Sequence, residues 1–157
     1  MKSLEKNIEF DINNLVIKDI IVVRASIDNP KSIPALEVDT KINTEISIEH
    51  ALNKEAKMLR LIFSCKLKPS NYDEIEAKFE IAFYFEIGSF DSLIHYEEKS
   101  SYASINEIFL ISIANITYST SRGIIFSRCL GTIFNKFILP PISNEKIIEM
   151  LNIDPIK

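Results

Sequence analysis

Three long stretches of this chain alternate apolar and polar residues at a period of two, and they constrain the fold more than any other feature. The longest covers residues 36–48, and two more follow at 59–67 and 77–87. Such alternation predicts strands with one dry face and one wet face. Parallel strands are usually buried on both faces and do not alternate in this way, so we expect an antiparallel sheet.

A fourth strand is expected earlier in the chain, where apolar residues recur through residues 15–23. Turn-forming residues at 28–34 follow this strand, and Pro34 cannot donate to a strand ladder. Asn53 and Lys54 suit a hairpin connection, and residues 68–71 end the next strand. We therefore expect four strands, within about residues 7–92, joined as an antiparallel meander.

Beyond residue 100 the apolar residues recur at spacings of three and four, which favours helix. A long helix is expected at about 104–131, because Gly131 stands where helices commonly end. An apolar linker with Pro140 and Pro141 comes next, and Ser143 suits the start of a short helix at 143–151. The expected fold is α+β in a single domain, 1–157: a four-stranded antiparallel sheet followed by a long helix and a short C-terminal helix packed on one face.

Composition excludes several classes of protein. Hydrophobic residues make up 46% of the 157 positions and charged residues 25%, which is typical of a globular domain. No apolar run reaches the roughly 18 residues of a spanning helix, and residues 1–9 lack an apolar signal core, so we expect a cytoplasmic protein without membrane insertion. The net charge of −4 without a basic stripe argues against nucleic acid as a partner.

Residues that could carry catalysis are sparse. The chain has three glycines, too few and too scattered for a phosphate-binding loop, and its two histidines lack metal-ligand spacing. His95 beside Glu97 is the one acid–base candidate, and a solvated loop explains it more simply. Cys65 and Cys129 are expected to be buried free thiols. We therefore predict no enzyme activity, no catalytic residues, no metal and no cofactor.

Apolar side chains are more abundant than one core obviously requires. Residues 83–85 are all aromatic, so one strand carries rings on both faces, and Phe134, Phe137, Ile138 and Leu139 gather in the linker. One interpretation is a core together with a self-association interface. The other is a groove for apolar segments of another polypeptide, because large exposed apolar patches usually mark binding sites.

The order of elements and several local strings resemble the protein-export chaperone SecB family. The resemblance covers nearly the whole chain, although no single motif is diagnostic. The matching strings are Phe10-Asp11-Ile12, Ile17-Lys18-Asp19-Ile20, Asn29-Pro30, Pro34, Asn115-Ile116, Arg122, Gly131-Thr132, Leu139-Pro140 and the short helix at 143–151.

This resemblance implies a cytoplasmic, ATP-independent holdase, assembled as a dimer or a dimer of dimers, that binds unfolded or precursor polypeptides in apolar grooves. It leaves two roles open. One is protein export with the motor SecA as a partner, although Val22, Val23 and Arg24 stand where the export chaperone carries an acidic SecA contact. The other is that of a solitary SecB-like chaperone dedicated to one partner, such as the antitoxin of a toxin–antitoxin system.

The resemblance also implies client-binding residues, because the family's groove is lined by apolar residues of its second strand and by its last helix. We add two aromatic residues from their position in the linker. The alternative is that all of these residues form the core between sheet and helix. The candidates are Leu36, Val38, Ile42, Phe134, Phe137, Ile147, Ile148 and Leu151.

Overall fold

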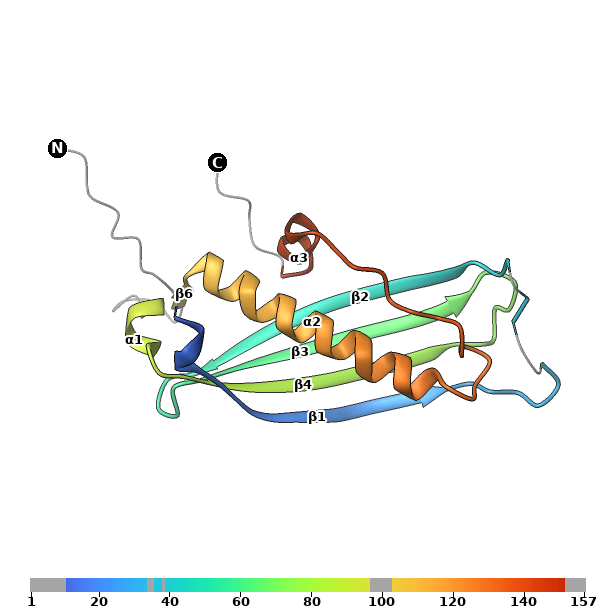
Figure 1. The fold of residues 1–157 in the computed structure, drawn as a ribbon, viewed down its shortest axis with the longest axis horizontal. Coiled ribbons are helices and arrows are strands. Elements are labelled where there is room, and N and C mark those ends of the chain that lie inside the picture. The colour runs from blue at the N-terminus through green and yellow to red at the C-terminus, as the bar shows by residue number, and fades with distance from the viewer. Residues whose placement is uncertain (1–10, 34–35, 38, 97–102, 152–157) are drawn as a thin grey trace.

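A four-stranded antiparallel sheet forms one layer of the structure, and a long helix lies across one of its faces (Figure 1). The computed structural model describes all residues except 1–10, 34–35, 38, 97–102 and 152–157. The sheet, the long helix and the short C-terminal helix are those expected from the sequence, and together they form an α+β fold. Their bounds are β1 (Leu15–Ile27), β2 (Ile42–Asn53), β3 (Met58–Pro69), β4 (Ala77–Ile87), α2 (Glu107–Cys129) and α3 (Asn144–Met150).

The strand order β1-β4-β3-β2 corrects the expected meander. The hairpins β2–β3 and β3–β4 are as predicted, but β1 pairs with β4, with Leu15 opposite Ile87. The connection between β1 and β2 therefore passes from one edge of the sheet to the other, as in a Greek key. Alternation specifies which face of a strand is dry but not which strand lies beside it, so the sequence pattern could not distinguish the two arrangements.

Two strand boundaries also differ from expectation. Residues 36–41 keep the alternation but precede β2, which begins at Ile42, and β1 continues to Ile27. The sequence analysis missed several short elements. These are a 3-10 turn (Ile12–Asn14), α1 (Phe90–Leu93) and a two-stranded ribbon of β5 (Ile94–Tyr96) and β6 (Ala103–Ile105).

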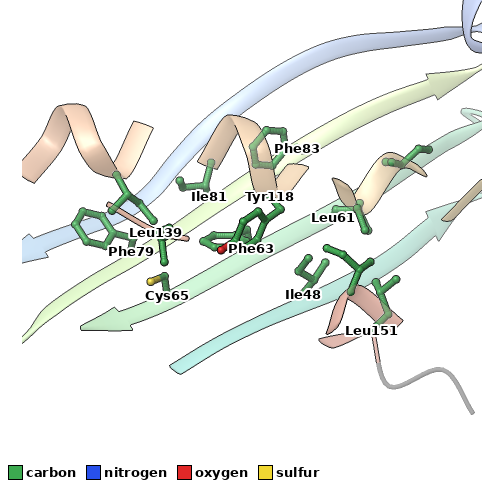
Figure 2. Close-up of a cluster of buried hydrophobic side chains, with 14 of the residues drawn as sticks. Ile48, Leu61, Phe63, Cys65, Phe79, Ile81, Phe83, Tyr118, Leu139 and Leu151 are labelled. Atoms are coloured by element: carbon green, nitrogen blue, oxygen red, sulfur yellow. The ribbon is translucent and has the colours of Figure 1, made fainter. Parts of the chain in front are cut away.

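The core lies between α2 and the helix-facing side of β2, β3 and β4. Cross-strand register places Leu61 opposite Phe83 and Phe63 opposite Ile81, and all four side chains are fully buried. The ring of Tyr118, from α2, meets Phe63 edge-on with 5.8 Å between ring centres, and Figure 2 shows it inserted between helix and sheet. The apolar faces predicted by alternation along the strands and by the three-to-four spacing along α2 thus pack against each other in one layer.

The cysteines are free and buried, as predicted. Burial raises the pKa of the Cys65 thiol to about 12 and that of Cys129 to about 11. Both thiols therefore stay protonated at neutral pH and act as small apolar side chains.

The helix ends follow local capping rules. The Asn106 side chain accepts a hydrogen bond from the backbone N–H of Phe109 at 3.0 Å, and the Ser143 hydroxyl accepts one from Lys146 at 3.4 Å. Gly131 has a φ of +75° just past the end of α2, which confirms the predicted stop. By length and composition alone α2 could cross a membrane. Nine of its residues are buried in the structure, and this burial accounts for its apolar composition.

Candidate functional site

A hollow of about 330 Å³ lies where the connection between β1 and β2 meets the linker between α2 and α3. We call it the linker groove. Its walls come from two parts of the chain far apart in sequence, one around Thr40 and the other around Phe137. The lining residues are Leu36, Glu37, Thr40, Ile42, Ile133, Phe134, Asn135, Lys136, Phe137 and Ile138.

Side-chain hydrogen bonds hold the linker that forms one wall of the groove. The Asn29 side-chain oxygen accepts a hydrogen bond from the backbone N–H of Ile133 at 3.0 Å. The Tyr118 hydroxyl donates to the carbonyl of Pro140 at 2.7 Å, and the side chain of Asn115 donates to that of Asn144 at 3.0 Å. The linker thus has no regular secondary structure over most of its length, yet it is tied to the rest of the fold at both ends of the wall.

The groove is lined by both apolar and polar residues. Six of its lining residues are aliphatic or aromatic, and Ile138 is 52% exposed. Glu37 and Lys136 are exposed, so they can offer opposite charges to an occupant. The apolar part of such a surface binds by excluding water from its side chains.

Four of the eight predicted client-binding residues meet in this groove: Leu36, Ile42, Phe134 and Phe137. Phe134 is only 1% exposed, so its ring is packed beneath the surface of the groove. Leu36, Ile42 and Phe137 are partly exposed. Val38 lies outside the described residues.

The three predicted residues in α3 and at its C-cap lie elsewhere. Ile147 is fully buried and Leu151 is 4% exposed, and Figure 2 shows Leu151 beside Ile48 of β2 among the core side chains. Ile148 is partly exposed but does not line the groove. Ile147 and Leu151 thus lie in the core between sheet and helix, which was the alternative interpretation of the sequence.

The sequence analysis named Ile138 in the apolar linker but not among the client-binding candidates, and it did not name Thr40 or Ile133. Ile133 adjoins the candidate Phe134, whereas Thr40 gives no signal without the structure. The aromatic residues Phe83 and Phe85, which raised the possibility of an exposed patch, are completely buried.

The edge strand β1 carries a second apolar surface. Five of its large aliphatic side chains are at least 36% exposed, on both faces of the strand. The signal was present in the sequence, because four consecutive apolar residues at 20–23 must point to both faces. The exposed side chains are Val16, Ile17, Ile20, Ile21 and Val23.

The histidines offer little for chemistry. His95 is exposed on β5, and its expected partner Glu97 lies outside the described residues. His50, on β2, has its pKa lowered by burial. The described part of the chain contains no group of three His, Cys, Asp or Glu side chains that could hold a metal ion.

No protein-family model matches the chain, and no curated protein matches it. Among solved structures, the Mycobacterium tuberculosis Rv1957 SecB-like chaperone, in complex with a ChAD peptide from the Rv1956 HigA1 antitoxin, is similar in fold. The two chains are 16% identical, with a TM-score of 0.56, and the match covers 83% of this chain and 91% of that chain. At this identity the likeness establishes a shared fold.

Proposed function

We propose that this protein is an ATP-independent holdase that binds extended segments of unfolded polypeptides in the linker groove. The observation that carries the proposal is a tethered apolar groove, open to solvent, on a SecB-like fold. At about 330 Å³ the groove lies at the lower end of the range for ligand pockets, ~300–1,000 Å³. A groove of this size suits a few apolar side chains from a segment of a client, with the rest of the client outside.

The net charge favours a particular kind of client. The protein carries a net charge of −4, which favours encounter with segments rich in Lys and Arg. Apolar contacts impose little sequence preference, so the apolar part of the groove can accept many clients. A general holdase therefore fits this surface.

A second candidate is a chaperone dedicated to one partner. The solved structure of similar fold holds a peptide from an antitoxin, and this observation favours a single peptide ligand for the present chain as well. Protein export with SecA as a partner is the third role of this fold. Calorimetric titration with purified SecA tests it directly, and binding at micromolar affinity would assign the export role.

We further propose that the protein is a homo-oligomer that associates through β1, as a dimer or a dimer of dimers. β1 is an edge strand with exposed aliphatic side chains, and such an edge in a soluble protein is normally covered. Ile20→Lys places a charge on this strand. It should lower the mass measured by multi-angle light scattering, whereas an unchanged mass would contradict association through β1.

The proposed function is binding alone, without catalysis. The groove is lined mainly by apolar residues and offers nothing that would hold a cofactor, so we propose that the protein acts without one and is not an enzyme. Free buried thiols suit a reducing compartment, which supports a place in the cytoplasm.

Light scattering tests the proposal. A chemically denatured model protein is diluted into buffer with and without this protein, and suppression of its aggregation at a near-stoichiometric ratio, without ATP, is the expected result. Ile138→Asp places a charge in the groove and should abolish the suppression. Ile108→Asp is the matched control, because Ile108 is 72% exposed, does not line the groove and lies in the first turn of α2, where an acid is tolerated.

The outcomes separate the candidates. A well-folded oligomer that does not suppress aggregation would shift the assignment to the dedicated partner. Equal loss of suppression in both Asp variants would show that the linker groove is not the binding site.

A further inference from the structure

The groove contains one polar atom that the fold leaves unpaired. The hydroxyl of Thr40 is completely covered and has no hydrogen-bond partner. The backbone N–H of the same residue donates to the carbonyl of Glu37 at 3.0 Å, so the unpaired group is the side chain alone. A covered hydroxyl without a partner destabilises the protein, so its place in a binding groove calls for an explanation.

Two other buried hydroxyls, those of Thr117 and Ser121, also lack partners. Both residues are completely buried on the inner face of α2. Thr40 differs from them because it lines a hollow that is open to solvent. A change of χ1 from one staggered rotamer to another would turn this hydroxyl towards a different side of the residue.

We infer that the Thr40 hydroxyl is the point at which the groove hydrogen-bonds the backbone of an extended client segment. The inference rests on the proposed function and names a client-binding residue within it. A threonine hydroxyl can donate to a peptide carbonyl or accept from a peptide N–H, so it recognises the backbone whatever the client's sequence.

The rest of the lining explains why one such group is needed. An extended segment brings peptide N–H and C=O groups, and each group that loses water must find another partner. The apolar side chains of the groove provide none. The other polar lining residues, Glu37, Asn135 and Lys136, are exposed and remain hydrated. Thr40 differs from them because it is only partly exposed and its hydroxyl oxygen is covered.

Two variants of Thr40 separate a role in binding the client from a role in the stability of the protein. Thr40→Val keeps the shape and removes the hydroxyl, and Thr40→Ser keeps the hydroxyl. The probe is reduced, carboxymethylated α-lactalbumin, a permanently unfolded chain, and a second probe is a short leucine-rich peptide flanked by lysines. Affinities are measured by fluorescence anisotropy and stability by urea denaturation.

We expect Thr40→Val to bind both probes about five- to tenfold more weakly, which is the effect of one lost hydrogen bond. Its denaturation midpoint should stay equal or rise, because the unpaired hydroxyl is gone. Thr40→Ser should bind as the wild type does. Replacing the peptide's amides one at a time by esters should, at one position, weaken binding to the wild type and leave binding to Thr40→Val unchanged.

Other outcomes overturn the inference. If the wild type binds and Thr40→Val binds equally well, the hydroxyl has no role in recognition. If Thr40→Val and Thr40→Ser both lose affinity together with a lower midpoint, the residue is structural. If the wild type binds neither probe, the proposed function fails first, and this inference fails with it.

Discussion

Replacing Tyr118 by Phe removes a single hydroxyl that joins α2 to the linker. The Tyr118 hydroxyl donates to the carbonyl of Pro140 at 2.7 Å, and the residue is only 3% exposed. The phenylalanine ring keeps the edge-on contact with Phe63, so packing is preserved. The variant therefore isolates the effect of the hydrogen bond on the stability of the protein and on the linker groove.

The expected loss is about 1 kcal/mol of unfolding free energy, the typical net contribution of a hydrogen bond whose acceptor stays partly covered. For a domain of this length that corresponds to a fall in Tm of about 2–4 °C. Tyr118→Ala should lose about 3–5 kcal/mol, because it also opens a cavity beside Phe63. The difference in unfolding free energy between the two variants measures the contribution of the ring, because both variants lack the hydroxyl.

Urea denaturation followed by circular dichroism gives both free energies. The midpoint should fall in Tyr118→Phe while the denaturant slope stays constant, as expected when the native fold is unchanged. The same variant should bind unfolded polypeptide more weakly although Tyr118 does not line the groove, because it holds the linker wall. A Phe variant as stable as the wild type to within about 0.3 kcal/mol would refute the role assigned to this bond.

Three further predictions concern stability. Gly131→Ala should lower the unfolding free energy by about 1 kcal/mol, because Gly131 has a φ of +75°. Gly123 lies inside α2 with open space around an added methyl group, so Gly123→Ala should raise the unfolding free energy by about 0.5–1 kcal/mol. Equal effects of the two changes in urea denaturation would contradict this. Ser143→Ala should lose about 1 kcal/mol with the cap of α3, and no change in midpoint would show that the cap is unimportant. Alkaline pH should destabilise the protein: the Cys65 thiol has a folded pKa of about 12 against 9.0 when unfolded, so its contribution is complete below pH 9 and is lost as the pH rises towards 12. The slope is at most about 1.4 kcal/mol per pH unit for this thiol, and Cys65→Ala should flatten the pH profile.

The sequence predicted the parts of the fold that depend on periodicity and local chemistry. Alternation identified the strands, and capping signals at Gly131 and Ser143 placed two helix boundaries within a residue or two. Pairing of β1 with β4 depends on contacts across the chain, which a local pattern does not contain. The alternation before Ile42 was overextended for a related reason, since a strand needs a partner as well as a pattern.

The candidate site was predicted in part. Phe134 and Phe137 were chosen for their place in an irregular apolar linker, and both line the groove together with Leu36 and Ile42. The residues at the last helix were chosen from family resemblance, and Ile147 among them is completely buried, because a short amphipathic helix must first cover its own sheet. Thr40 could not be found from sequence, because an unpaired hydroxyl is a property of three-dimensional packing.

The strand order has a consequence for how the chain is made. As the protein leaves the ribosome, β1 emerges first, and its partner β4 arrives only after the whole β2–β3 hairpin has been synthesised. Long-range pairings of this kind slow folding and leave apolar segments exposed in the meantime. During that interval the strand around Ile20 and Ile21 is an extended, unpaired, aliphatic segment. Each new chain therefore passes through a stage in which an apolar strand is unpaired, and such stages are prone to aggregation.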